Sequence, residues 1–307
     1  MFESKLINLI LNDSLFKNKP IVLMHLGAAG SNFYYWKKIS KNSILISLDG
    51  NDKIDEININ FKKIIKENII ISDKKGFSKF YVTKDPDCSS LLKPDLKINK
   101  NWYFSHRFKI KKKIKIKTTT INDFLSKHKL NYIDWFVIDI QGMDLKIVKD
   151  LKDHIRNKIK IIDIEPGFEK FYKKEDSFLD IYKFLNKKFQ FSDMKFGFNF
   201  KVKNNNFSFL DKKFLFLRNT PSKVYTNLIF TNKKIDKRTI FIKIIYLLQS
   251  NKYYEAKSII DENFKKLRIS NYLKTEINRL IFLNKIILIG FYPYFYIKKV
   301  LVNFLDK

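Results

Sequence analysis

The amino-acid sequence predicts an α/β fold, a doubly wound and mostly parallel β-sheet followed by a small C-terminal helical region. Short apolar runs alternate with helical patterns over the first two thirds of the chain, and acidic or polar residues follow several runs directly. From about residue 220 the pattern becomes helical throughout. We therefore expect an N-terminal helix over 1–19, a sheet domain over 20–219 and a C-terminal helical region over 220–307.

Composition limits the class of protein. The chain has 307 residues, of which 45% are hydrophobic and 16% aromatic, which excludes a mainly disordered protein. A single cysteine, Cys88, excludes a disulfide framework and favours a reducing compartment. The first 19 residues mix charges into their apolar positions, unlike a signal peptide, so we expect a cytoplasmic protein.

The net charge of +30 is high. Such a charge is typical of proteins that bind nucleic acid or an anionic membrane surface. The lysines are scattered through every predicted element, however, and this distribution indicates a chain-wide bias with solvated lysines. We therefore do not expect nucleic acid as the partner, although a basic nucleic-acid-binding protein or an RNA methyltransferase stays an alternative.

The first predicted strand leads into a glycine turn. Ile21–Met24 is a continuous apolar run, Gly27 to Gly30 form the turn, and Ser31 and Asn32 supply an N-cap signal before the aromatic helix start Phe33–Trp36. A strand, a glycine turn and a helix N-terminus together present backbone N–H groups to a ligand. Taken alone, the turn also fits an ordinary tight turn.

The second predicted strand makes a cofactor site the better interpretation. Ser43–Leu48 is apolar and ends in Asp49, about 20 positions after the glycines, where a carboxylate can accept from ribose hydroxyls. The chain contains no G-x-x-x-x-G-K-[ST] motif, and its turn is not G-x-G-x-x-G. A small adenosyl cofactor therefore fits better than a dinucleotide or a P-loop nucleotide.

The remaining elements of the sheet domain follow in order. Up to the middle of the chain we expect a helix over Ile54–Glu67, a third buried strand over Asn68–Ser72, a short strand over Lys79–Thr83, a loop over Lys84–Asn101 and a half-exposed strand over Phe108–Lys117. We then expect a helix capped by Thr118–Thr120, buried strands at Trp135–Asp139 and Lys160–Ile164, a helix from Met143, a helix over Asp176–Lys187, and strands at Phe189–Phe196 and Phe214–Arg218.

The C-terminal region reads as helices over Arg238–Ser250, Tyr253–Asn263 and Asn271–Leu283. The next stretch, Ile286–Ile297, is uncharged and aromatic, but it is shorter than the roughly 20 residues of a transmembrane helix. A buried terminal helix is one interpretation. The other is a helix that lies on a membrane surface, which would place the protein peripherally on a membrane.

Carboxylates at predicted strand ends are the main candidates for chemistry. In a parallel sheet we expect Asp49 to bind the ribose, Asp73 to accept from an adenine amine, and Asp139 with Gln141 to face the reacting end. A helix cap is the alternative role for such carboxylates. Asp163 and Glu165 follow the next strand, and together with Asp139 they could bind Mg²⁺ through hard oxygen ligands. No Cys–His spacing predicts zinc.

An ordered set of motifs resembles a known family. Ile138–Gly142, the sequence I-D-I-Q-G, resembles the I-D-V-[EQ]-G-x-E signature of the FkbM-type methyltransferases, which depend on S-adenosylmethionine. The other resembling blocks, in order, are Val22–Gly30 (D-V-G-A-x-G in the family), Ile69–Pro94, Lys117–Phe124 (T-T-L-D-D-F), Glu165–Tyr172 and Phe178–Phe191. The resemblance extends from Pro20 to Arg218.

The resemblance implies a Rossmann-like fold and methyl transfer from S-adenosyl-L-methionine to a hydroxyl, commonly of a sugar, a polysaccharide or a secondary metabolite. It implies a small-molecule or glycan acceptor and a role in polysaccharide biosynthesis. Three residues depart from the family pattern: His25 stands for Asp, Asp144 for Glu and Val137 for Lys. The predicted cofactor-binding residues are His25, Gly27, Ala28, Gly30, Asp49, Asp73, Asp139 and Gln141.

For the acceptor proton, Asp139 is the candidate general base if burial raises its pKa. His106 is the second candidate, provided that the segment Lys84–Phe108 folds over the site. A non-catalytic protein that keeps this fold and docks through its C-terminal helices is a further alternative, and cofactor binding distinguishes it from an enzyme.

Overall fold

A large β-sheet with helices beside it forms the larger of two units of the protein. The computed structural model describes residues 2–50, 57–201, 221–266 and 269–286. Residue contacts divide the chain into two units, one made of 20–234 and the other of 1–19 with 235–307.

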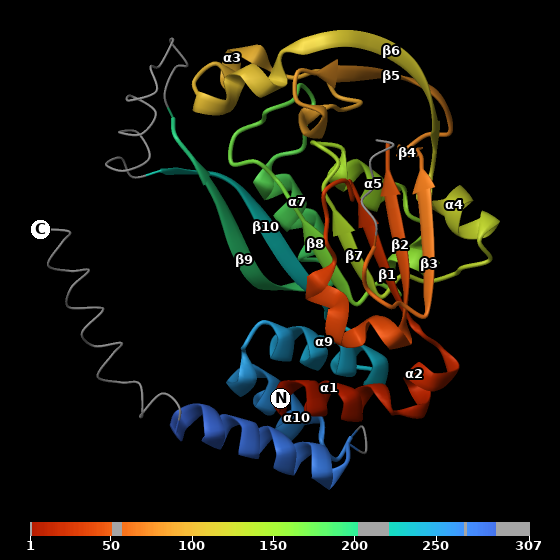
Figure 1. Ribbon diagram of the computed structural model, residues 1–307, viewed down its shortest axis with the longest axis vertical. Coiled ribbons are helices and arrows are strands. Elements are labelled where there is room, and N and C mark those ends of the chain that lie inside the picture. Colours follow the sequence, from red (N-terminus) through yellow and green to blue (C-terminus); the bar gives the residue numbers. More distant parts are fainter. Residues whose placement is uncertain (1, 51–56, 202–220, 267–268, 287–307) are drawn as a thin grey trace, which may run out of the picture. The chain divides into compact units, whose positions relative to one another are not determined.

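The sheet of the first unit has seven strands in the order β3-β2-β1-β7-β8-β10-β9 (Figure 1). Five strands are parallel, whereas β10 is antiparallel to both β8 and β9. The strands are β1 (Ile21–Leu26), β2 (Ser43–Asp49), β3 (Lys63–Asn68), β7 (Trp135–Ile138), β8 (Ile161–Ile164), β9 (Phe189–Asn199) and β10 (Ser222–Asn232). This arrangement confirms the predicted α/β, mostly parallel sheet.

The strand order reverses between β1 and β7. Leu23 pairs with Trp135 and Leu26 with Ile138, so the two strands end at the same level. Ligands of open parallel sheets bind beyond the carboxyl ends of the strands at such a reversal. The predicted glycine turn after β1 and the predicted Asp139 after β7 both lie at this point.

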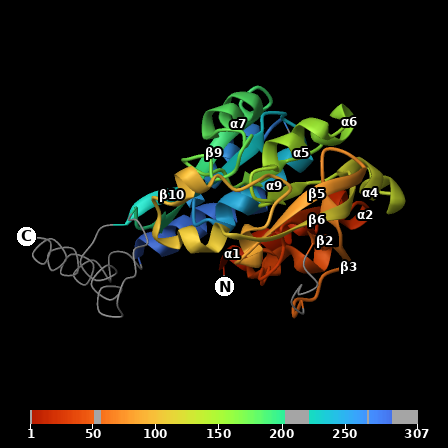
Figure 2. The ribbon, with the colours of Figure 1, turned by 90° about the horizontal axis from the view of Figure 1, so that it is seen from above.

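The core lies between the sheet and four helices that Figure 2 shows on one side of it. These helices are α4 (Ile121–Lys127), α5 (Asp144–Asp150), α6 (Asp153–Arg156) and α7 (Phe178–Leu185). Their apolar residues, Phe124 and Leu145 among them, pack with Met24 and Phe136 of the sheet. The predicted cap is confirmed, because the Thr120 side chain accepts from the backbone N–H of Asp123.

The 3₁₀-helix η1 (Tyr34–Asn42) supplies aromatic residues that pack on the sheet. The ring of Trp135 lies 5.2 Å from that of Tyr35 and 6.0 Å from that of Trp36, both in edge-to-face geometry. The predicted aromatic start of a helix after the turn is therefore present, with a 3₁₀ conformation.

A second, three-stranded sheet has the order β4-β6-β5. It consists of β4 (Ile70–Ile71), β5 (Gly76–Thr83) and β6 (Ile110–Thr119), and Figure 1 shows β5 and β6 beyond the carboxyl ends of β1, β2 and β3. Short helices connect β5 to β6: η2 (Pro86–Cys88), α3 (Leu96–Asn99) and η3 (Tyr103–Phe108).

The predicted helix over Ile54–Glu67 is wrong for the part that the structure describes. Residues 63–68 form β3, which pairs in parallel with β2. From Ile57 to Phe61 the apolar residues alternate with exposed asparagines, a period of two that suits extended chain. The predicted third buried strand, Asn68–Ser72, is also wrong, because Asn68 ends β3 and Ile70–Ile71 form the separate strand β4, which pairs with β6.

The second unit is helical. Its helices are α1 (Phe2–Leu11), α2 (Ser14–Asn18), α9 (Lys237–Gln249), α10 (Tyr253–Asn263) and a helix over 271–286. Phe16 packs on Phe241 with ring centroids 6.3 Å apart, and the Lys237 ammonium lies 2.8 Å from the Asp13 carboxylate. The N-terminal segment thus packs with helices that begin after β10, whereas the sequence predicted the helical region from residue 220.

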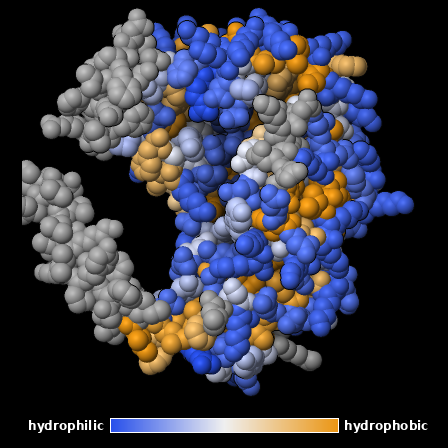
Figure 3. Space-filling view, in the orientation of Figure 1, coloured by the Kyte–Doolittle hydropathy of each residue, from blue (hydrophilic) through white to orange (hydrophobic). Residues whose placement is uncertain are grey.

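Two predicted segments fall outside the described residues: the strand Phe214–Arg218 and, beyond residue 286, the apolar terminal stretch. Within the described helices, none combines the length and the apolar character that a membrane span requires. Hydrophilic residues make up most of the face seen in Figure 3, with hydrophobic residues in smaller areas among them.

Candidate functional site

A cavity of about 590 Å³ lies at the carboxyl ends of β1, β2 and β7. The residues that follow these strands form one side of it, and β5 and β6 cover the other side. This volume is within the range of about 300–1,000 Å³ that small-molecule sites occupy. The lining includes Gly27, Ala29, Asp49, Ile69, Ile70, Ile71, Phe80, Val82, Pro86, Ser90, Lys112, Ile114, Ile116, Asp139 and Gln141.

Gly27 makes the closest backbone contact of the site. Its φ is +73°, and a Cβ added there would lie 1.7 Å from the carbonyl oxygen of Asp139. Its N–H donates to the Leu48 carbonyl oxygen at 3.0 Å, and the N–H of Asp139 donates to that of Leu26 at 3.1 Å. Only glycine has both the conformation and the space that this position requires.

Asp49 lies against the glycine turn, as the sequence predicted. Its Oδ2 accepts from the backbone N–H of Ala29 at 3.0 Å, and both residues line the cavity. An ionised carboxylate has about four acceptor sites. Asp49 can therefore keep this bond and also accept from the hydroxyls of a ligand.

The walls next to Asp49 are apolar. Ile69, Ile70 and Ile71 line the cavity from one side, and Phe80 with Ile114 line it from the three-stranded sheet. A flat aromatic base fits such walls, and a ribose fits the adjacent carboxylate. The residues present are therefore compatible with an adenosyl group across the ends of β1 and β2.

Asp139 also lines the cavity, next to Gly27. The side-chain amide of Gln141 donates to Asp139 Oδ1 at 2.8 Å. The pKa of Asp139 is well above its usual value, chiefly because burial penalises the charged form and then because Glu165 and Asp144 are negative neighbours. A buried carboxyl with a raised pKa at a cavity wall is a candidate for proton transfer.

The loop that carries Gln141 is held from two sides. Asp144 accepts from the N–H groups of Ile140 and Gly142, both at 3.0 Å, and Ser90 Oγ donates to the Gln141 carbonyl oxygen at 2.7 Å. Gln141 has a φ of +57°, which non-glycine residues rarely adopt. These bonds hold a strained residue at the cavity, as is common at functional sites.

Tyr172 fixes the Gln141 side chain. Its buried hydroxyl is 2.8 Å from Gln141 Oε1 and 2.9 Å from the Cys88 carbonyl oxygen, and its single proton is shared between these two acceptors. With Oε1 facing Tyr172, the amide nitrogen of Gln141 faces Asp139. Tyr172, Gln141 and Asp139 thus form a chain of hydrogen bonds that ends at the cavity.

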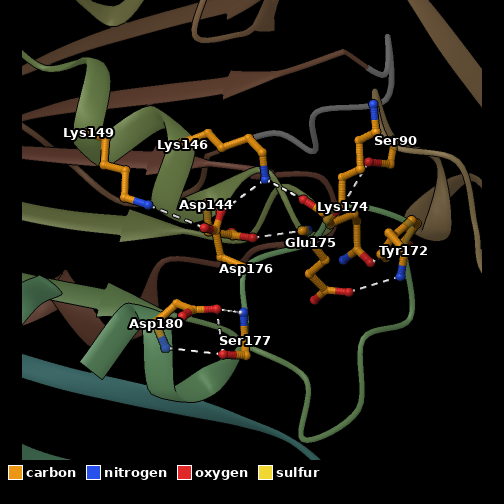
Figure 4. A network of polar contacts seen from close by, with 12 residues as sticks. Ser90, Asp144, Lys146, Lys149, Tyr172, Lys174, Glu175, Asp176, Ser177 and Asp180 are labelled. Carbon is orange, nitrogen blue, oxygen red and sulfur yellow. Dashed lines mark hydrogen bonds and ion pairs between the residues drawn. The ribbon is translucent and has the colours of Figure 1, made fainter. Parts of the chain in front are cut away.

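A second polar network holds the segment that contains Tyr172 (Figure 4). Glu175 Oε2 accepts from the Tyr172 N–H at 2.9 Å, and Lys146 Nζ donates to the Lys174 carbonyl oxygen at 2.7 Å and to Asp176 Oδ2 at 2.9 Å. Burial raises the pKa of Glu175 to about 7. The loop after β8 is thereby tied to α5.

Glu165 lies beside Asp139, and Asp163 lies beside Glu165; neither Glu165 nor Asp163 lines the cavity. Ile138 pairs with Ile164 in the parallel register, so Asp139 and Glu165 follow neighbouring positions of adjacent strands. Burial raises the pKa of Glu165 to about 7 and that of Asp163 to about 6. Asn227 donates to Asp163 Oδ1 at 3.3 Å.

The magnesium site suggested by the sequence finds no support. Within the parts of the chain that the structure describes, no group of three or more His, Cys, Asp or Glu side chains is placed to hold a metal ion, and this includes Asp139, Asp163 and Glu165.

The structure brings together half of the predicted cofactor-binding residues. Gly27, Asp49, Asp139 and Gln141 line the cavity; His25, Ala28, Gly30, Asp73 and the second base candidate His106 are not among its lining residues.

The structure shows why two of the predicted residues, His25 and Asp73, do not line the cavity. The ring of His25 packs edge-on against Phe33, with centroids 5.7 Å apart, and burial lowers its pKa to about 4. Asp73 follows β4, which belongs to the small sheet, and its carboxylate accepts from the Ser72 hydroxyl at 3.0 Å.

Sequence reasoning did not assign a role to Ser90, Tyr172 or Glu175. None lies directly at the end of a strand of the large sheet, so the strand-end argument could not find them. A signal existed for two of them: Ser90 lies in the motif block Ile69–Pro94, and Tyr172 lies in the block Glu165–Tyr172. The segment from Lys84 to Leu91 does border the cavity, through Pro86, Ser90 and their neighbours.

One comparison with known proteins gives a match. The sequence model of a family described as "Methyltransferase FkbM domain" matches residues 30–196, more than half of the chain. No curated protein and no solved structure matches the chain. The matched segment includes β2, the three-stranded sheet, β7 with Asp139 and Gln141, and the loop with Tyr172.

Proposed function

Because this chain belongs to the FkbM methyltransferase family, we propose that it is an S-adenosylmethionine-dependent O-methyltransferase. We propose a hydroxyl of a sugar, a polysaccharide or a secondary metabolite as its acceptor. The observation that carries the proposal is one cavity that is lined by Gly27 of the glycine turn, by Asp49 and by the buried Asp139.

Asp49 would bind the cofactor ribose while it keeps its bond to Ala29. Ile70 and Ile114 would enclose the adenine between the ends of the large sheet and the small sheet. When bound, S-adenosylmethionine supplies an electrophilic methyl group on a positively charged sulfur. The protein then has to hold an acceptor oxygen in line with that methyl group, and positioning of this kind contributes roughly 7–11 kcal/mol in well-oriented reactions.

Asp139 would take the proton of the acceptor hydroxyl. A carboxyl with an ordinary pKa is a weak base, whereas burial beside Glu165 and Asp144 makes Asp139 more basic. The Gln141 amide, itself held by Tyr172, would keep the carboxylate pointed at the cavity. A positioned base contributes about 10²–10⁴-fold to the rate.

The strands β5 and β6 would exclude water from the reacting groups. Their apolar side chains, with Phe80 and Ile116 among them, line the cavity opposite the large sheet. A dry cavity strengthens the interactions of Asp139 with its neighbours and with the acceptor. The buried single cysteine, Cys88, agrees with a cytoplasmic location, which we also propose.

The first experiment is calorimetric titration of the protein with S-adenosylhomocysteine. We expect binding, and we expect Asp49→Ala to weaken it. Absence of binding to the wild-type protein would contradict the cofactor assignment and favour a docking protein without catalysis.

The second experiment uses a labelled methyl donor with a panel of glycans, hydroxylated small molecules and single-stranded RNA. Label on a hydroxyl of a glycan or small molecule supports the proposal. Label on RNA, or on nitrogen or carbon, would refute the acceptor assignment while leaving the cofactor site in place.

A further inference from the structure

The outer face of the β5–β6 pair carries lysines and aromatic residues. The ladder pairs Phe77 with Lys117, Lys79 with Lys115, and Tyr81 with Lys113. Side chains alternate between the two faces of a sheet, so these six residues share one face. We call this surface the lysine face: Phe77, Lys79, Tyr81, Lys113, Lys115 and Lys117.

The inner face of the same two strands covers the cavity. Phe80 pairs with Ile114 and Val82 with Lys112, and all four residues line the cavity. The lysine face therefore lies directly behind the cover of the proposed active site, on the side turned away from the cavity.

Within the described residues the charges of the lysine face have no acidic partner. All four lysines are exposed, and none of them forms an ion pair there. Lys79 and Lys115 lie opposite each other across the ladder, where like charges destabilise a strand pair. An anionic partner would remove this repulsion.

The positive charges repeat along one strand. Lys113, Lys115 and Lys117 are two residues apart on β6, which places successive side chains about 6.6–6.8 Å apart. A row of point charges along a strand complements an extended chain that carries one negative charge at regular intervals. Lysine suits such a partner because its ammonium group is a point charge on a flexible stem and needs no fixed bidentate contact.

We propose that the lysine face docks an acidic polysaccharide, which would be held there while one of its hydroxyls is methylated. This inference rests on the proposed glycan acceptor. It requires that the acceptor, or the polymer to which the acceptor belongs, carries carboxylate or phosphate groups.

The aromatic residues argue against nucleic acid. Single-stranded nucleic acid is bound on aromatic rings that are open to successive bases. Of the two aromatic residues on the lysine face, Phe77 is 68% exposed, but the Lys115 ammonium lies 5.1 Å from its ring centroid. The other, Tyr81, is partly buried, so its ring is not fully open to a base. One partly occupied ring is a poor stacking platform. It is also too little apolar surface for insertion into a membrane.

The test is binding of the full-length protein to polygalacturonate, an acidic polysaccharide, at several salt concentrations. Dextran serves as the neutral polymer and poly(U) as the nucleic-acid probe. The variant Lys79→Gln/Lys113→Gln/Lys115→Gln/Lys117→Gln removes the charges of the lysine face. The control variant Lys170→Gln/Lys173→Gln/Lys183→Gln/Lys187→Gln removes the same number of exposed charges near α7.

We expect polygalacturonate to bind, binding to weaken as salt rises, and dextran not to bind. The lysine-face variant should bind roughly tenfold or more weakly, whereas the control variant should stay close to wild type. Equal losses in the two variants would show non-specific attraction to a basic protein, and tighter binding of poly(U) would favour nucleic acid. Either result would overturn the proposal.

Binding of S-adenosylhomocysteine is measured on the same variants. It should be unchanged in both, because the lysine face points away from the cavity. A protein that binds the cofactor product but no acidic polymer refutes only the docking inference. A protein that binds neither refutes the proposed function as well.

Discussion

The carboxylate of Asp49 accepts a hydrogen bond from the backbone N–H of Ala29 at 3.0 Å. This bond joins the end of β2 to the turn that follows β1, across 20 positions of sequence. It holds the carboxylate at the cavity and uses one of its acceptor sites for the turn. Asp49 therefore has a structural and a proposed binding role, which substitutions can separate.

Asp49→Ala should weaken binding of S-adenosylhomocysteine roughly tenfold to hundredfold, because a hydrogen bond to a charged group contributes about 1.5–3 kcal/mol. Calorimetry measures this effect. Asp95→Ala is the matched control, since Asp95 also accepts from a backbone N–H, at 3.0 Å from Lys97, but does not line the cavity. Equal affinities of the wild type and Asp49→Ala would remove Asp49 from the cofactor site.

Gly27→Ala should destabilise the protein far more than Gly30→Ala. Both glycines have a φ of +73°, so both substitutions incur the left-handed strain of about 1–2 kcal/mol. A Cβ at Gly27 would also overlap the carbonyl oxygen of Asp139, whereas at Gly30 no atom lies within 4 Å. Urea unfolding of the two variants gives the difference. Similar stabilities would mean that the turn and the Asp139 loop do not pack as described.

Asp139→Asn should lower the methyl-transfer rate by about 10²–10⁴-fold while S-adenosylhomocysteine still binds. In the wild type the rate should rise with pH, because the base acts in its ionised form and burial raises its pKa. Rates measured from pH 5 to 9 on both proteins test this. A variant with a wild-type rate, or a wild-type rate that falls over this range, would exclude Asp139 as the base.

Tyr172→Phe should lower the rate more than it lowers cofactor affinity, because it leaves the oxygen of the Gln141 side chain without its donor. Gln141 could then rotate and release Asp139. Tyr182→Phe on α7 is the control, since within the described residues its hydroxyl makes no hydrogen bond. If the two tyrosine variants had equal rates, the proposed chain from Tyr172 to Asp139 would be unsupported.

Glu175 should make the protein less stable as the pH rises from about 4.5 to about 7. Its pKa is raised from 4.5 to about 7 in the folded state, so stability is full at acidic pH and is lost as the folded protein gives up this proton. The difference corresponds to a loss on the order of 3 kcal/mol. Glu175→Gln should flatten this part of the stability curve.

Urea unfolding at pH 5 and pH 8 measures the effect, with Glu255→Gln on α10 as an exposed control. Because glutamine keeps an oxygen that can accept from the Tyr172 N–H, the variant should retain the loop. Parallel pH profiles of wild type and Glu175→Gln would contradict the assigned burial.

The sheet domain was predictable because buried parallel strands are local signals. Ile21–Met24 and Trp135–Val137 are apolar without interruption, and each is followed by a polar turn. The edge strand β3 was not predictable in this way. Lys63–Asn68 is mostly exposed and is extended only because β2 offers it a backbone partner. Each β2 residue precedes its partner in β3 by 19 positions in the sequence.

The candidate site was predictable where it depends on strand ends. Asp49 and Asp139 lie where the sequence placed them, since parallel strands that start from one edge must end at the other. The small sheet was not foreseen as a cover, because the sequences of β5 and β6 give no signal of what the two strands face. His25 was predicted to bind the cofactor because of its position in the motif, but its ring packs against Phe33 and Trp36.

The contact between Gly27 and Asp139 has a mechanical consequence. The carbonyl group of one loop fills the space that a side chain of the other would need, so neither loop can shift without displacing its neighbour. A movement of the turn when an adenosyl group enters would be passed directly to the carboxyl group that serves the acceptor. Cofactor binding at the turn would thus set the alignment of the neighbouring carboxyl group.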